Sequence, residues 1–153
     1  MTTPTIFSDV AANPFMAKRE TQGITSERAV ALIPAATAAA TNVGMHRFQP
    51  GFALTALAIV SDDLDTATNV TLDVGYLYDG TTGEDDNAFL DGLDIAQDAG
   101  SRVWPVDDGL LTGVSFVAVD DGYLSVTIQD APTTTEGNIT TLAQFTYDLT
   151  TAD

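Results

Sequence analysis

The stretch VTLDVGYLY at Val70–Tyr78 decides the fold class of this chain. Apolar side chains occupy nearly every second position, and Thr71, Asp73 and Gly75 stand between them. Period-two alternation with β-branched and aromatic residues is typical of a β-strand that lays one face on a core. The sequence therefore predicts a strand here, with neighbours of the same kind on both sides.

The segment Tyr123–Gln129 shows the same alternation, with its most apolar side chains on one face. It follows Asp120-Asp121-Gly122, and an Asp-Gly pair between two apolar stretches is typical of a tight β-hairpin. The strand-like run Leu110–Val119 ends at this turn. The pattern therefore predicts a hairpin in which Leu110–Val119 pairs with Tyr123–Gln129.

Further segments have the length of a strand. Gly51–Ser61 is mostly apolar, which predicts a strand buried on both faces or crossing the core. Asn87–Ser101 is compatible with a short helical turn or an irregular strand, and Gly92 weakens the helical alternative. Pro105 restricts its strand to a sheet edge, because proline cannot donate to a central ladder. Strands are also expected from Ala29 onward, at Arg102–Val106 and at Ile139–Leu149.

These strands predict an all-β fold, an antiparallel β-sandwich or barrel-like body with an extended N-terminal arm. The chain has 153 residues, the size of one ordinary domain. We expect an arm over residues 1–28 and a single β-sandwich domain over residues 29–153. The arm has little periodicity, and its isolated apolar residues are those of an extended segment, either disordered or ordered on a partner.

The charge of the chain is strongly uneven. It carries 22 acidic and five basic residues, a formal net charge of −17. Four of the bases lie in residues 1–47 with three acids, whereas residues 48–153 hold Arg102 and 19 acids. This balance argues against direct binding of nucleic acid or of an anionic membrane, which need cationic partners. Many acids lie in predicted turns, where an aspartate side chain bonds the local backbone.

The sequence offers few groups for catalysis. It has no cysteine, and a Ser–His–Asp arrangement could use only His46, its single histidine. No serine lies in a G-x-S-x-G motif, and no glycine motif for nucleotides is present. We expect His46 to be an ordinary surface or loop histidine. We expect no enzyme, no catalytic residues and no cofactor.

Acidic clusters are the remaining candidates for a site. Asp62, Asp63 and Asp65 form one cluster, Glu84–Asp86 form another, and two further pairs are Asp107-Asp108 and Asp120-Asp121. Loop carboxylates suit calcium, but none of these runs has the spacing of an EF-hand loop. We therefore expect solvated turn aspartates and no metal site. The alternative function is a β-sandwich adhesin or carbohydrate-binding module with calcium at these loops.

Part of the chain resembles small head proteins of tailed bacteriophages. The resemblance is best over Phe52–Gly100 and rests on DDLDT at Asp62–Thr66, LDVG at Leu72–Gly75 and FLDG at Phe89–Gly92. More loosely, it covers Ala29–Leu149. The proteins it points to are capsid decoration, or cement, proteins, with β-sandwich or related bodies on the outside of the mature head. The family includes trimers and monomers, and it has no catalytic residues to carry over.

The resemblance implies a structural virion protein that binds the outer capsid surface and stabilises the mature head by clamping neighbouring major capsid subunits. It implies the major capsid protein as partner and a homotrimer at three-fold or quasi-three-fold positions. The arm is then the expected grip, because an extended segment can add a strand to a sheet edge or lie in a groove. The predicted capsid-binding residues are Ile6, Phe7, Phe15, Met16, Lys18 and Arg19.

Overall fold

The computed structural model describes residues 4–11, 25–80, 83–104 and 116–147, and these residues form ten strands and no helix. None of them belongs to an apolar helix long enough to cross a membrane. The strands are β1 Ile6–Phe7, β2 Thr25–Ile33, β3 Thr41–Phe48, β4 Phe52–Ser61, β5 Thr71–Tyr78, β6 Asp85–Leu93, β7 Gly100–Trp104, β8 Phe116–Val117, β9 Gly122–Gln129 and β10 Gly137–Tyr147.

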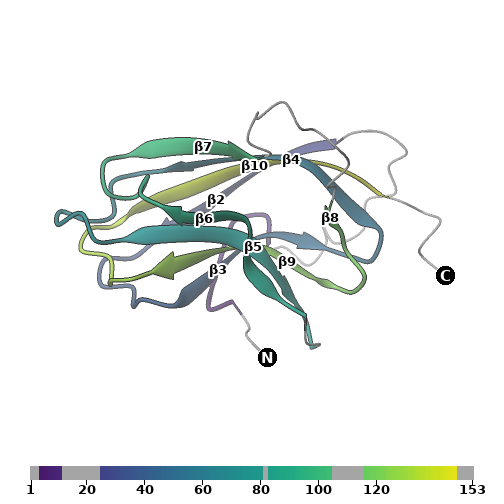
Figure 1. Cartoon of the computed structure of the whole chain (residues 1–153), viewed down its shortest axis with the longest axis horizontal. Coiled ribbons are helices and arrows are strands. Elements are labelled where there is room, and N and C mark those ends of the chain that lie inside the picture. Colours follow the sequence, from purple (N-terminus) through teal and green to yellow (C-terminus); the bar gives the residue numbers. More distant parts are fainter. Residues whose placement is uncertain (1–3, 12–24, 81–82, 105–115, 148–153) are drawn as a thin grey trace.

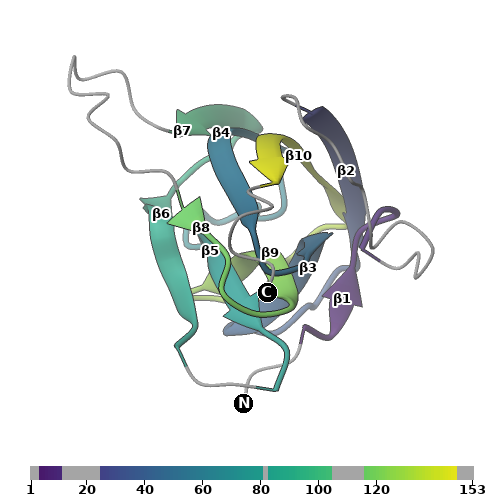
Figure 2. The ribbon, with the colours of Figure 1, turned by 90° about the vertical axis from the view of Figure 1, so that its right-hand side faces the viewer.

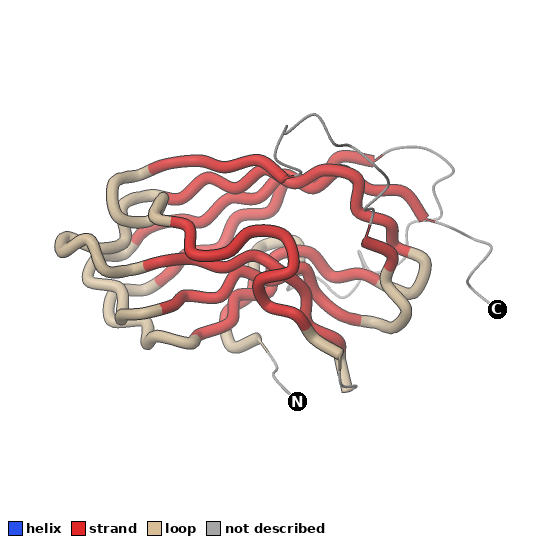
Figure 3. Tube along the Cα trace, viewed as in Figure 1, coloured by secondary structure: helices blue, strands red, loops and turns tan. Residues whose placement is uncertain are grey.

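The strands form two five-stranded sheets that pack face to face as a sandwich (Figure 1). The first sheet has the order β1-β3-β9-β5-β6; the second has the order β2-β10-β4-β7, with β8 also paired to β4. All strand pairs are antiparallel except β1 with β3. Figure 3 shows the two layers of strands with many of the connecting loops at one end. The predicted all-β sandwich is confirmed.

The core lies between the two sheets and follows the alternation of the sequence. Leu72 and Val74 of β5 and Leu124, Val126 and Ile128 of β9 are all buried in it. Burying a side chain of this size contributes roughly 1.5–3 kcal/mol. In β5 and β9, the apolar residues at alternate positions are the ones that enter the core. These two paired strands therefore hold the first sheet against the second.

The predicted hairpin at residues 120–122 is wrong. The short strand β8 pairs with β4 of the second sheet, whereas β9 pairs with β3 and β5 of the first. The chain therefore crosses from one sheet to the other at this turn. Gly122 serves close packing there, because a Cβ on it would lie 2.2 Å from the Leu77 carbonyl oxygen. Residues 110–115 of the predicted partner strand lie outside the described residues.

Two further strands differ from the expectation. The strand β2 begins at Thr25, so it crosses the predicted boundary between residues 28 and 29. Of the two alternatives for the segment from Asn87, the irregular strand is confirmed: residues 85–93 form β6, whose pairing with β5 shifts register twice. Asp85 and Asp86 therefore begin a strand instead of closing a loop. The edge strand expected at Arg102 is confirmed as β7, which begins at Gly100.

Candidate interaction surface

Residues 4–11, which we call the N-terminal strap, lie along one open side of the sandwich (Figure 2). In the strap, β1 runs parallel to β3, and the Ser8 amide donates to the Gly44 carbonyl over 2.8 Å. Asp9 turns to the other sheet, where its amide donates to the Val30 carbonyl over 2.9 Å. Its Oδ1 accepts the Val30 amide over 2.8 Å. The strap thus ties the edge of the first sheet to the edge of the second.

The strap contains two of the six predicted capsid-binding residues. Ile6 is partly buried and packs against the core. Phe7 is 38% exposed, and its ring lies 5.5 Å from the ring of Tyr123. The other four, Phe15, Met16, Lys18 and Arg19, lie outside the described residues. The first apolar pair of the predicted arm therefore contacts the body of its own chain, and the capsid-binding role of the six stays a prediction.

His46 is buried between the sheets, so its prediction as a surface or loop histidine is wrong. It lies in β3 and is 1% exposed. Its Nδ1 lies 3.0 Å from Glu27 Oε1 of β2, and its Nε2 lies 2.8 Å from Thr141 Oγ1 of β10. No strand was predicted over residues 41–48, so nothing in the sequence indicated that this histidine is buried. With both ring nitrogens engaged, His46 joins the two sheets and is not placed to act as a base on a substrate.

Asp65, in the acidic loop between β4 and β5, braces that loop. Its carboxylate accepts the amides of Asn69, Ala67 and Val70 over 2.7, 3.0 and 3.0 Å. The hydroxyl of Thr134 lies 3.2 Å from the same group. The bond from the Asn69 amide is the largest influence that holds the pKa of Asp65 below its ordinary value. Asp65, the last acid of this cluster, therefore orders the backbone of the loop.

We expect Asp65→Ala to lower the melting temperature by several degrees, since it leaves the buried Val70 amide and the part-buried amides of Ala67 and Asn69 without their acceptor. Because the folded-state pKa of Asp65 is lowered, its contribution is full at neutral pH and is lost as the pH falls through that value. Thermal denaturation from pH 7 down to pH 2 measures this. The difference between wild type and variant should persist down to the ordinary pKa of aspartate and shrink below it. Asp98→Ala, at an exposed acid, is the control. Equal melting temperatures for both variants at pH 7 would contradict the role of Asp65.

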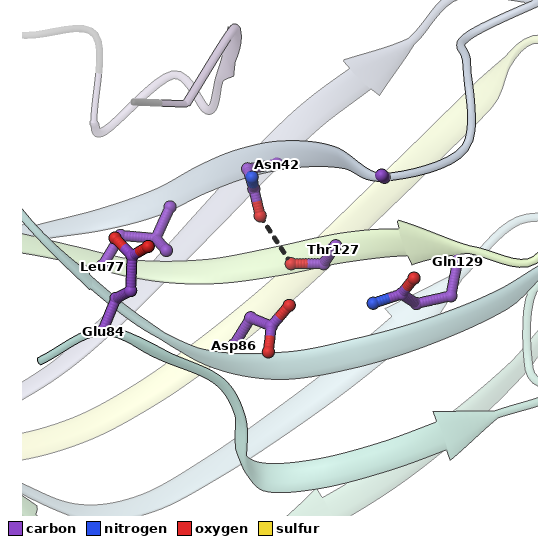
Figure 4. Close-up of a pocket in the computed structure, with 7 residues that line it drawn as sticks. Asn42, Leu77, Glu84, Asp86, Thr127 and Gln129 are labelled. Carbon is purple, nitrogen blue, oxygen red and sulfur yellow. Dashed lines mark hydrogen bonds between the residues drawn. The ribbon is translucent and has the colours of Figure 1, made fainter. Parts of the chain in front are cut away.

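A polar pocket lies on the outer face of the first sheet (Figure 4). The Glu84 and Asp86 side chains line it opposite the hydrogen bond from Thr127 Oγ1 to Asn42 Oδ1, which is 2.7 Å long. Within the described ranges, no three acidic or histidine side chains group closely enough to hold a metal ion. The lining residues are Ala40, Asn42, Leu77, Glu84, Asp86, Thr127 and Gln129.

Asp73 adds to the acidity of this outer face. It is 6% exposed, and it accepts the Gly92 amide over 2.7 Å and the Gln129 amide nitrogen over 2.9 Å. Burial is the main cause that raises the pKa of Asp73, and the charges of Asp91 and Asp86 add to it. The outer face of the first sheet is therefore polar, acidic and internally hydrogen-bonded.

The outer face of the second sheet has the opposite character. We call the outward-pointing positions of β2, β10, β4 and β7 the acid-free face, because no Asp or Glu occupies one in these four fully described strands. Arg28 is the charged residue on it. Four large apolar side chains are exposed there: Leu32 by 54%, Val60 by 50%, Val103 by 59% and Leu142 by 42%.

This face could not be predicted from the sequence, because its strands carry apolar residues on both sides. The apolar run of β4 predicted burial on both sides, but Val60 is half exposed and Ala58 is partly exposed. In β10, Leu142 alternates outward between buried Thr141 and Ala143. In β4, apolar residues occupy the inward-pointing and the outward-pointing positions alike. A single sequence could not separate core residues from exposed ones in such a strand.

No protein-family model matches the chain, and none of the curated proteins matches its sequence. Its fold is similar to chains in three solved phage capsids. A chain in the "Capsid of Ralstonia phage GP4" aligns with a TM-score of 0.72 and 19% identity, covering 93% of this chain and 97% of that one. A chain in the "Cyanophage Pam1 capsid asymmetric unit" aligns with a TM-score of 0.61 and 16% identity, covering 90% of this chain and 99% of that one. A chain in the acid-stable capsid of Helicobacter pylori bacteriophage KHP30 aligns with a TM-score of 0.52 and 12% identity, covering 80% of this chain and 91% of that one. The likeness extends over nearly the whole of the first two chains.

Proposed function

We propose that this chain is a structural protein of a phage virion that binds the outside of the capsid. There it stabilises the mature head by clamping neighbouring major capsid subunits, as a homotrimer at three-fold or quasi-three-fold positions. The observation that carries the proposal is the match of fold over 93% of this chain and 97% of a chain in a phage capsid. A likeness over both full lengths fits a protein whose whole body serves one structural role.

The charge of the molecule supports a position on the outer surface. A formal charge of −17 on 153 residues repels the phosphate backbone of a packaged genome. The acid-free face gives the same molecule one side without acidic residues, which can approach another protein without burying unpaired carboxylates. An acidic, polar outer face on the first sheet is then suited to contact with solvent.

Binding to purified heads tests this function. Full-length protein, added to heads of the encoding phage made without it, should sediment with them and saturate at a fixed number of copies per head. It should also raise the temperature at which the heads release their DNA. Protein that stays in the supernatant at every salt concentration, and heads with unchanged stability, would contradict the proposal.

The arm needs a test that leaves the strap in place. Deleting residues 1–28 would remove β1, the contacts of Asp9 and the start of β2, so lost binding could reflect a damaged fold. Replacing Phe15, Met16, Lys18 and Arg19 by serine avoids this. We expect weaker sedimentation with heads at an unchanged melting temperature. Binding equal to wild type would show that these four residues do not grip the capsid.

A further inference from the structure

We infer that the acid-free face is the surface that seats this protein on the head, against an apolar, weakly charged surface of the major capsid protein. The inference rests on the proposed function and names the surface and the kind of partner. Contiguous exposed apolar patches on a water-facing sheet are typical of interaction sites.

The strand register makes the exposed apolar side chains neighbours. Ala58 of β4 stands opposite Leu142 of β10 on one side and opposite Val103 of β7 on the other. Val60 lies two residues along β4 and therefore points to the same side. These residues form a continuous apolar stripe across three adjacent strands.

Charge separates this face from its surroundings. Nearby acids lie at its margins: Asp9 on the strap, Asp62 at the end of β4, and Asp94 before β7, where it pairs with Arg102 over 3.2 Å. An interface core is usually poor in charged residues and has a polar rim. The acid-free face has this arrangement in the free protein, so docking it would desolvate apolar surface and few charges.

A second copy of this chain fits the face less well than a capsid subunit does. The four strands hold 9, 11, 10 and 5 residues. At about 3.4 Å per residue and about 4.8 Å between strands, they offer a plane of about 570 Å². A stable dimer buries about 800 Å² on each partner. Two copies packed face to face through this surface would also bring their two Arg28 side chains together. A contact of this size without acidic side chains is better suited to a lattice, where several contacts per assembly add through avidity.

The test is the binding of face variants to heads. Val60→Asp with Val103→Asp places two charges on the face, and we expect at least a tenfold loss of apparent affinity. The matched control is Val119→Asp, because Val119 is 77% exposed but lies between β8 and β9, outside the face. It should bind as wild type does. A second variant, Val60→Thr with Val103→Thr, keeps the side-chain shape and β-branching, and an intermediate loss is expected from it.

The outcomes separate this inference from the proposed function. If wild type does not bind heads, the proposed function fails. If wild type, the double aspartate variant and Val119→Asp all bind equally well, the function stands and the face is not the contact. A concentration-dependent dimer of wild type that the double aspartate variant abolishes, without loss of head binding, would assign the face to a second copy and overturn the inference. Matching melting temperatures of the variants exclude misfolding.

Discussion

His46→Ala is expected to destabilise the fold by about 3 kcal/mol, because His46 is buried between the sheets and contacts β2 and β10. The change leaves a cavity between the sheets and removes the hydrogen-bonding partner of the Thr141 hydroxyl. Large-to-small substitutions in a core cost about 2–5 kcal/mol, and a buried polar group that loses its partner costs about 1–3 kcal/mol. Glu27, whose side chain is 10% exposed, also loses its 3.0 Å contact with the ring. The midpoint of urea denaturation measures the loss.

The neighbouring residue in β3 provides the control. Arg47 points outward, and its guanidinium carbon lies 5.8 Å from the centre of the Tyr123 ring. Exposed contacts of this kind contribute about 0.5–1 kcal/mol, so Arg47→Ala should have a small effect. Equal losses from His46→Ala and Arg47→Ala would contradict the placement of His46 between the sheets.

Gly75→Ala is the second substitution with a large expected effect. Gly75 lies in β5, where the start of β6 crosses so closely that a Cβ would stand 2.0 Å from the Asp85 carbonyl oxygen. The three nearest atoms are all backbone atoms of Asp85 and Asp86, so relief requires β6 to move. Overpacking usually costs about 1–3 kcal/mol, and this contact should place the loss at about 3 kcal/mol or above.

Gly44→Ala tests whether the nature of the obstacle decides the cost. Its Cβ would meet side chains of the strap, Phe7 at 3.1 Å and Pro4 at 3.3 Å, which can shift by a few tenths of an ångström. We expect a clearly smaller loss than for Gly75→Ala in the same denaturation experiment. A smaller loss for Gly75→Ala than for Gly44→Ala would show that the backbone at the start of β6 does not lie this close to Gly75.

Strands with regular alternation could be predicted from the sequence, and those without it could not. The spacing of Val126 and Ile128 in β9 predicts that they are buried, and the same holds for Leu72 in β5. The strand β3 was missed because TNVGMHRF, residues 41–48, has no clear alternation and shifts register between Gly44 and His46. The hairpin prediction was wrong because an Asp-Gly turn fixes a local bend but does not determine the sheet to which the next strand belongs.

The candidate surface was hidden for a related reason. The sequence shows that acids are concentrated after residue 47, but charge is also separated between the two outer faces of the sandwich. Val103 of β7, for example, follows Arg102 and lies a few residues from Asp98 in the chain. Only the register with β4 places it beside Ala58 in the apolar stripe. Such a surface arises from pairing across strands, which a linear pattern does not contain.

A cryo-electron microscopy map of the mature head that carries this protein is the most direct test of its proposed place on the capsid. We expect density for a two-layer β-sandwich on the outer capsid surface, placed between neighbouring major capsid subunits, with β2, β10, β4 and β7 facing the shell. Density for this chain on the inner surface, or as the subunit that itself forms the shell, would contradict the claim.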